Sequence, residues 1–349
     1  MQGLDKYQAG GKILDQVLGA LVASVVPGTN IGLICKQADD MLMDLLSKVY
    51  AKGKTKCEKG IAYPTCISKN NCVGHYSPDE AANELVEDGD VLKLDCAVQI
   101  DGYVSHGAVT VIARDQEEPL TGPIADAVSA AHYCGEAIVR MLRPGTKNHE
   151  ITEVVGKICD AYGVKPVDGV LSHEMKRFVM LGGNTWANRA HADERIEECE
   201  LEAEQVYNVD ILISTGEGVP KVDPGIEASV FLRNMEETKD MRVKSARQVL
   251  GEIDRRFPTF MFGPRLLEHE QSKFGLKQLE REGMVYPFPP MFCKPEETVV
   301  QVRFTAVITG SNTVRVNNGY TPYVFSEKAI EDQDVLNILK RSTKRKAKK

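Results

Sequence analysis

Several features that would assign a protein to a familiar class are missing from this chain of 349 residues. It has no apolar run long enough to cross a bilayer, and its N-terminus, MQGLDKYQAGGKIL, lacks the basic and apolar regions of a signal peptide. Its nine cysteines are odd in number and form no CxxC pair, which argues against a disulfide framework or a zinc ribbon. No RNP motif, KH loop, zinc knuckle or phosphate-binding loop is present. These absences predict a protein of the cytosol or nucleus, with reduced cysteines and no membrane association.

Charge is distributed unevenly. The net charge is -7, yet seven of the 43 Lys and Arg residues lie in the last ten positions, so 36 remain to oppose 50 Asp and Glu. An acidic body therefore carries a basic tail, KRSTKRKAKK, over residues 340–349. Such a tail is typically disordered and is attracted to polyanions or serves as a nuclear address.

An internal repeat organises the chain. VVPGTNIGLICKQADDML (Val25 to Leu42) and MLRPGTKNHEITEVVGKI (Met141 to Ile158) share a Pro-Gly-Thr turn followed by an amphipathic helix, at an offset of 117. DVLKLDCAVQIDG and QVYNVDILISTGEG are matching apolar strands whose aspartates, Asp95 and Asp210, are offset by 115. Two such elements predict two related α/β halves. With a hairpin from Val98 to Val109 that turns at Asp101-Gly102, the pattern favours an α+β fold with an antiparallel-rich sheet and helices on one side.

A segment with a different residue pattern, helical and rich in basic residues, interrupts the second half. Within residues 221–283, KDMRVKSARQVLGEIDRRF places Val243, Ala246, Leu250, Ile253 and Phe257 at helical spacing. This predicts a helical insertion with a basic face, after which ETVVQVRFTAVITG resumes the sheet. A last helix is expected from Glu327 to about Lys340. The predicted domains are residues 1–220 with 284–339 (halves 1–120 and 121–220 plus 284–339), the insertion 221–283 and the disordered tail 340–349.

Polar residues on the strands indicate a site where the halves meet. A buried carboxylate is costly unless it is paired or binds a cation, so Asp95 and Asp210 require a partner. Aspartates at strand ends are common turn residues and would carry no meaning alone. Together with His75 and His173, however, they form a set of side chains that a divalent metal prefers.

The motifs KGIAYPTCISKNNCVGHYSP, KLDCAVQIDGY, GVLSHEMK and QVYNVDILISTGEG resemble, in order and spacing, the type 2 methionine aminopeptidases. They resemble still more closely the proliferation-associated (ErbB3-binding) protein family, a non-peptidase relative in peptidase family M24. The resemblance covers nearly the whole chain and implies the pita-bread fold with its helical insertion.

The resemblance also implies which residues stand where the peptidases hold two metals. The substrate-side histidine corresponds to His75, the first metal-binding aspartate to Asp95 and the metal-binding histidine to His173. The second aspartate, however, corresponds to His106, the first glutamate to the shorter Asp210, and the last glutamate to Arg303.

These substitutions reduce the charge of the ligand set from four negative charges to one. A guanidinium about 4 Å from a divalent ion would repel it by roughly 8 kcal/mol if the effective dielectric constant is about 20. We therefore expect Arg303 to bridge Asp95 and Asp210 in place of metals, with no cofactor and no catalytic residue. A mononuclear site of Asp95, His106, His173 and Asp210 is the alternative, and with it a metal-dependent methionine aminopeptidase with an altered site.

The resemblance implies a scaffold that binds ribosomal subunits and structured RNA, acts in ribosome biogenesis, translation and growth control, and is cytoplasmic with a nuclear and nucleolar pool. Protein partners would bind through the insertion and surface helices. Clustered cations support RNA binding, because such affinity comes mainly from counterion release. The expected RNA-contacting residues are Lys52, Lys54 and Lys56 in a loop, Arg242, Lys244, Arg247, Arg255 and Arg256 in the insertion, and Lys344, Arg345 and Lys346 in the tail.

Overall fold

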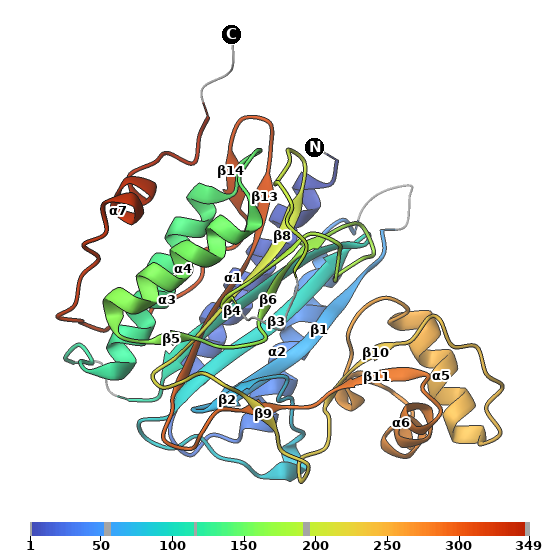
Figure 1. Ribbon diagram of the computed structural model, residues 1–349. Coiled ribbons are helices and arrows are strands. Elements are labelled where there is room, and N and C mark those ends of the chain that lie inside the picture. The colour runs from blue at the N-terminus through green and yellow to red at the C-terminus, as the bar shows by residue number, and fades with distance from the viewer. Residues whose placement is uncertain (1, 52–56, 115–116, 191–195, 346–349) are drawn as a thin grey trace.

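The computed structural model describes residues 2–51, 57–114, 117–190 and 196–345 (Figure 1). A large sheet has the strand order β1-β3-β4-β13-β8-β6-β7, with β14 added to β13 and β5 to β8. Within the described residues, every strand pair of this sheet is antiparallel. The strands are β1 (Lys59–Lys69), β3 (Val91–Ile100), β4 (Tyr103–Ile112), β5 (Lys165–Pro166), β6 (Leu171–Met175), β7 (Thr185–Ala187), β8 (Val206–Ser214), β13 (Val299–Ile308) and β14 (Thr313–Arg315).

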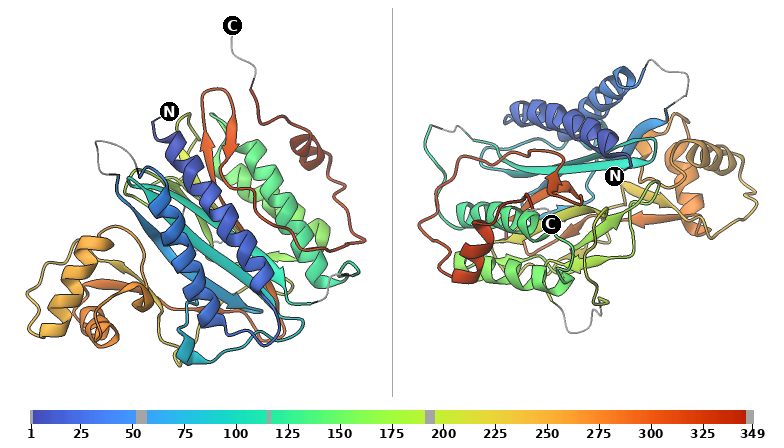
Figure 2. Two further views of the ribbon diagram at one scale, coloured as in Figure 1. Left: turned by 180° about the vertical axis from the view of Figure 1, so that it is seen from behind. Right: turned by 90° about the horizontal axis from the view of Figure 1, so that it is seen from above.

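Two helix pairs cover one face of this sheet. α1 (Leu4–Ser24) and α2 (Ile31–Lys48) pack on β1, β3 and β4 (Figure 2). In the other half, α3 (Pro123–Met141) lies over β13 and β8, and α4 (Asn148–Tyr162) packs against α3, β5 and β7. Their apolar sides meet alternate strand residues, such as Leu94 on β3 and Phe304 on β13. The residues between these point to the opposite face, since side chains alternate along a strand. The predicted α+β architecture with helices on one side is therefore confirmed.

Backbone hydrogen bonds show the internal repeat directly. The Gly28 N–H donates to the Val86 carbonyl at 2.8 Å, and the Gly145 N–H donates to the Leu201 carbonyl at 2.8 Å. Both glycines have a φ of 88°. In each half the accepting residue lies nine positions before the buried aspartate. The same turn thus ties a helix to the strand entry in both halves, which confirms the predicted repeat.

The β3–β4 hairpin turns at Asp101 and Gly102, as predicted. Their φ values of 56° and 82° are those of a type I′ turn, whose twist matches that of the strands it joins. A Cβ on Gly102 would lie 2.6 Å from the ring of Phe178, so glycine is required here for space as well as for backbone conformation.

Replacing Gly102 with Ala tests this close approach. Gly89→Ala is a matched control, because Gly89 has a φ of 84° but nothing within 4 Å of an added Cβ. We expect Gly89→Ala to lower the free energy of unfolding by about 1 to 2 kcal/mol. Gly102→Ala should cost at least about 1 kcal/mol more, because the Phe178 ring must move. Urea titrations measure both, and equal losses would contradict the packing argument.

The predicted insertion contains a small sheet as well as helices. β10 (Val230–Arg233) pairs with β11 (Val285–Phe288), and α5 (Lys244–Arg256), η2 (Pro264–Leu266) and α6 (Ser272–Arg281) pack around it. At its base, β9 (Lys221–Val222) and β2 (Cys72–Gly74) both pair with β12 (Met291–Phe292). Because β11 returns to β10, the compact unit extends past residue 283, and we propose that it spans the chain between β9 and β12.

A buried ion pair attaches this unit to the first half. Arg265 in η2 donates from Nη2 to Asp39 Oδ2 on α2 at 2.7 Å. Its Nη1 donates to the Pro78 carbonyl at 2.8 Å, beside the short η1 helix (Glu80–Ala82). The pair is nearly inaccessible to water, so it fixes how the insertion is attached to α2.

The last helix ends near Lys340 as predicted but begins later, and part of the expected tail contacts the rest of the chain. The last helix, α7, is Gln333–Leu339, because Asp332 caps it by accepting from the Asp334 and Val335 N–H groups. The tail was expected to be disordered from residue 340, but residues 340–345 return to the β13–β14 hairpin. There the Arg345 N–H donates to the Ser311 carbonyl at 2.7 Å. Residues 346–349 lie outside the described part of the chain.

No helix among the described residues is long and apolar enough to cross a membrane. The nine cysteines, all of which are described, are free thiols.

Candidate functional site

One row of residues crosses four neighbouring strands on the face opposite the helices. Asp95 on β3 pairs with Ala108 on β4, Ala108 pairs with Arg303 on β13, and Arg303 pairs with Asp210 on β8. The two aspartates thus flank Arg303, one on the adjacent strand and the other two strands away. The methyl group of Ala108 leaves room for the guanidinium to reach the more distant carboxylate.

Arg303 bridges the aspartates, as predicted. Its Nη1 donates to Asp95 Oδ2 at 2.6 Å, and its Nη2 donates to Asp210 Oδ2. Gln301, two residues earlier on the same face, donates from Nε2 to Asp210 Oδ1 at 2.8 Å and lies 3.5 Å from Asp95 Oδ2. The side chain of Arg303 is 11% exposed, so the bridge is largely protected from water.

Charge in this row is not fully balanced, because one guanidinium serves two carboxylates. Burial raises the pKa of Asp210 to about 6, although Arg303 opposes the rise. Burial also acts on Asp95, but Arg303 and His106 outweigh it and hold the pKa of that carboxyl below its usual value. The pKa of Arg303 is raised by the two carboxylates despite its own burial, so the guanidinium stays charged.

His106 binds the other oxygen of Asp95. Its Nε2 lies 2.8 Å from Asp95 Oδ1, and its ring packs against Tyr63 with centroids 5.0 Å apart. Burial and the neighbouring Arg303 lower the pKa of His106, which favours a neutral ring. Nε2 then carries the proton donated to Asp95, leaving Nδ1 buried without a partner.

Two further histidines border the row. His75 has a φ of 62° and a 2.8 Å hydrogen bond between its Nδ1 and the hydroxyl of Tyr63. His173 on β6 pairs with Asn208 on β8, beside the Asp210 position. Burial, then Arg303, lower the pKa of each histidine to about 4, so both are neutral near pH 7.

The donor set does not fit the two metals that the peptidase resemblance implies. Arg303 places a permanent cation between Asp95 and Asp210, where each carboxylate already accepts a hydrogen bond from it. Among the described residues, no group of three or more His, Cys, Asp or Glu side chains is arranged to hold a metal ion. The described geometry also gives no support to the mononuclear alternative, because His106 directs Nε2 to Asp95.

Sequence reasoning missed two residues of this site. Gln301 lies two positions before Arg303, so the period of a strand was a usable signal for its facing the aspartates. Tyr63 stands in the quoted KGIAYPTC motif, but only strand pairing from β1 through β3 to β4 places it beside His106, and only the packing of β1 against β2 brings His75 to it. Neither residue carries a charge, and so neither was counted in the electrostatic argument.

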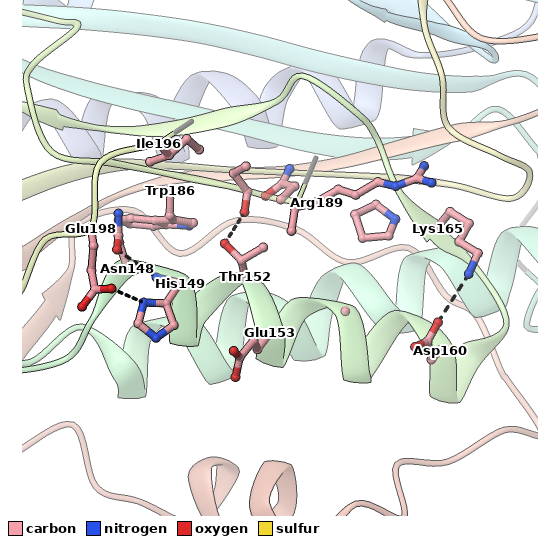
Figure 3. Close-up of a pocket in the computed structure, with 15 residues that line it drawn as sticks. Asn148, His149, Thr152, Glu153, Asp160, Lys165, Trp186, Arg189, Ile196 and Glu198 are labelled. Carbon is pink, nitrogen blue, oxygen red and sulfur yellow. Dashed lines mark hydrogen bonds and ion pairs between the residues drawn. The ribbon is translucent and has the colours of Figure 1, made fainter. Parts of the chain in front are cut away.

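A cavity of about 630 Å³ lies elsewhere, beside α4 (Figure 3). Part of its polar lining is paired internally: Lys165 contacts Asp160 at 3.5 Å, and Thr152 donates to the Ala187 carbonyl at 2.7 Å. Trp186 Nε1 and both amide atoms of Asn188, by contrast, are buried without a hydrogen-bond partner among the described residues. A second cavity, of about 980 Å³, separates the Tyr76–Ala82 loop from α6. It is crossed by an ion pair between Lys273 and Asp79.

The predicted RNA-contacting residues separate into three groups. Arg242, Lys244, Arg247 and Arg255 are exposed on and just before α5, and no described carboxylate pairs with them. Two others, Arg256 and Arg345, already form ion pairs or hydrogen bonds within the molecule. Arg256 pairs with Glu252 at 2.6 Å and with Glu268 at 3.2 Å, and the Arg345 guanidinium donates to backbone carbonyls. Lys344 is exposed, and Lys52, Lys54, Lys56 and Lys346 lie outside the described residues.

Comparisons with known proteins agree with this geometry. The model of metallopeptidase family M24 matches residues 5–226. The chain is 33% identical over 341 residues to ERBB-3 BINDING PROTEIN 1 of Arabidopsis thaliana, covering 98% of this chain and 86% of that protein. It is 34% identical over 339 residues to Proliferation-associated protein A of Dictyostelium discoideum, covering 96% and 88%. A solved structure of a thermophilic Arx1 aligns with a TM-score of 0.89 at 24% identity over 98% of both chains, which establishes the pita-bread fold alone.

Proposed function

The chain belongs to metallopeptidase family M24, in the group of ErbB-3-binding and proliferation-associated proteins, and from this premise we propose that it is a binding scaffold without peptidase activity. The observation that carries the proposal is Arg303, whose guanidinium lies between the two aspartates of the buried row. A two-metal hydrolase needs a metal-bound nucleophile and a polarised carbonyl at such a place. Here a cation that cannot deprotonate links the two halves instead.

We propose that the scaffold binds ribosomal subunits or structured RNA. Support comes from four exposed cations of the insertion that have no described carboxylate partner, Arg242, Lys244, Arg247 and Arg255. Of these, Arg247 also donates to the Met241 carbonyl at 3.1 Å. Because α5 buries Ala246, Val249 and Ile253 in the insertion core, its exposed side carries charge outward. Cations without carboxylate partners are free to replace the counterions of a phosphate backbone. Roles in ribosome biogenesis, translation and growth control, with cytoplasmic and nuclear pools, belong to the same proposal.

Sedimentation with ribosomal particles tests this proposal. We expect the unaltered protein to travel with ribosomal subunits in sucrose gradients at low salt. The variant Arg242→Gln, Lys244→Gln, Arg247→Gln should lose about tenfold or more of its affinity, because up to three phosphate contacts are removed. The matched control is Lys12→Gln, Lys36→Gln, Lys48→Gln, which changes the charge equally on exposed positions of α1 and α2. Absence of the unaltered protein from ribosomal fractions would overturn the proposal.

A further inference from the structure

The cavity of about 630 Å³ beside α4 lies apart from the buried row around Arg303, and the proposed function makes no use of it. Its walls come from one face of α4 on one side and from β5, β7 and the residues after β7 on the other (Figure 3). Its size lies within the range of about 300 to 1,000 Å³ that small-molecule sites have. The α4 residues that line it follow the spacing i, i+3, i+4, i+7 and i+11 of a single helix face. They are His149, Thr152, Glu153, Gly156 and Asp160.

Gly156 leaves space on the cavity side of α4. A Cβ added at this position would meet no atom within 4 Å, so close packing does not require glycine here. Glycine is also less favourable than alanine in the interior of a helix. The helix therefore carries a residue that weakens it, at a position where any larger side chain would enter the cavity.

Two buried polar side chains at this cavity have no hydrogen-bond partner among the described residues. Trp186 and Asn188 are each 1% exposed, and both line the cavity. The unpartnered atoms are the indole Nε1 of Trp186 and both amide atoms of Asn188, Nδ2 and Oδ1. Buried polar groups are normally satisfied, because an unmade hydrogen bond costs stability. Three such atoms at one cavity indicate a partner from outside the chain.

Strand geometry directs both side chains toward α4. Trp186 lies on β7 in the apolar core beneath the helices, and its ring packs on Tyr207 with centroids 5.0 Å apart. The Asn188 N–H donates to the Val170 carbonyl at 3.0 Å, which continues the β6–β7 pairing past the end of β7. Because side chains alternate along a strand, Asn188 lies on the same face as Trp186.

We propose that this cavity binds a neutral, planar nitrogen heterocycle of nucleobase or nucleoside size. A side-chain amide presents a donor beside an acceptor in one plane, so both atoms of Asn188 are satisfied by a group that presents an acceptor beside a donor. The edge of adenine that carries N6 and N7 has this pattern and pairs with asparagine through two hydrogen bonds. Trp186 Nε1 is a further donor. An anion would leave Oδ1 without a partner, and a cation would leave both donors without one.

The charge around the cavity favours an uncharged ligand over a phosphorylated one. The charged Lys, Arg, Asp and Glu residues of its lining are Lys165, Arg189, Glu153, Asp160 and Glu198. Carboxylates therefore outnumber cations, and Lys165 already pairs with Asp160 at 3.5 Å. Such a rim does not attract a phosphate group. We expect a nucleoside to bind more tightly than its monophosphate.

The fluorescence of Trp186 tests the proposal directly, because this residue is the only tryptophan of the chain. The full-length protein is titrated with adenosine, uridine, guanosine and cytidine, and isothermal titration calorimetry provides an independent readout. We expect adenosine to bind saturably at one site per chain and to change the emission of Trp186, while ribose alone does neither. If none of the four nucleosides binds saturably, water satisfies these polar atoms and the proposal is wrong. Tighter binding of adenosine monophosphate than of adenosine would contradict the neutral ligand.

Two substitutions locate the binding in this cavity. Asn188→Leu keeps a similar volume and should weaken adenosine binding about tenfold or more. Its thermal midpoint should not fall, because the described chain gives the amide atoms no hydrogen bond to lose. Gly156→Phe should abolish binding by filling the cavity. Gly156→Ala is its matched control and should bind within about twofold of the unaltered protein, with a raised thermal midpoint.

The Gly156 pair decides the question if Asn188→Leu does not fold. Equal adenosine binding by Gly156→Phe and Gly156→Ala would rule out this cavity, as would unaltered binding by a folded Asn188→Leu. Neither position belongs to the insertion or to the row around Arg303. Sedimentation of these variants with ribosomal particles should therefore match that of the unaltered protein, and failure of the cavity proposal leaves the scaffold proposal standing.

Discussion

Replacing Arg303 with Met is expected to lower the free energy of unfolding near pH 7 by about 3 to 5 kcal/mol. Methionine keeps much of the volume of the arginine stem, so the loss reports mainly on charge. Asp95 and Asp210 would remain buried without the cation that both contact. Guanidinium chloride titrations measure the loss. The control Arg281→Met, at an exposed position on α6, should stay within about 0.5 kcal/mol of the unaltered protein.

The pH dependence of this loss identifies its cause. Without Arg303, burial and mutual repulsion would raise the pKa of both carboxyl groups above their unfolded values. The folded variant would then bind more protons than the unfolded chain, so its stability should increase as the pH falls from 7 toward 4. In the unaltered protein the lowered pKa of Asp95 and the pKa of about 6 for Asp210 act in opposite directions. The difference between the two proteins should therefore shrink in acid.

A charge-free row provides the rescue experiment. Adding Asp95→Asn and Asp210→Asn to Arg303→Met removes both uncompensated carboxylates, and we expect most of the lost stability to return at pH 7. The variant with three substitutions should also lose the acid stabilisation. A stability of Arg303→Met that does not depend on pH, or that the two asparagines fail to restore, would show that packing, rather than charge, explains the loss.

Restoring the residues that the peptidases carry at the positions of His106, Asp210 and Arg303 should create affinity for metal ions. The variant His106→Asp, Asp210→Glu, Arg303→Glu returns the row to the peptidase pattern and raises its negative charge from one to four. It also removes a repulsion of roughly 8 kcal/mol for a dication about 4 Å away. We expect the variant to bind Mn²⁺ or Co²⁺ at least about 100-fold more tightly than the unaltered protein, as measured by isothermal titration and by metal content after gel filtration.

Stability supplies a second readout for this variant. Without metal it holds several buried carboxylates and should unfold at a lower temperature than the unaltered protein. Added Mn²⁺ should raise its midpoint in proportion to the logarithm of metal concentration, because the ion binds the folded state alone. Arg303→Glu alone is the control and should respond less, since His106 still occupies an aspartate position. Equal metal binding by the unaltered protein would overturn the view that Arg303 excludes metals and would revive the peptidase alternative.

Much of the candidate site was predictable because it depends on residue patterns within short stretches of the sequence. The offset of 115 between Asp95 and Asp210 comes from a repeat that can be read in the chain, and both aspartates lie on strands that are apolar enough to recognise. The placement of Arg303 depended on the register of one strand. That register was predictable because Val300 and Phe304 face the helices, so that a shift of one residue would have buried charge among them.

Other features were decided only by the tertiary structure. Gln301 and Tyr63 complete the row through strand pairing between distant segments, and β11 joins the insertion because it returns to β10 across more than 50 residues. Composition marked the C-terminal residues as a free cationic tail, but carbonyl groups of the β13–β14 hairpin bind Arg345. The alternation of apolar and polar residues along a strand, and the internal repeat, depend on residues close together in the chain, so the sequence alone predicts them. Which carbonyl or carboxylate meets a given arginine depends on contacts between remote segments, and these exist only once the chain is folded.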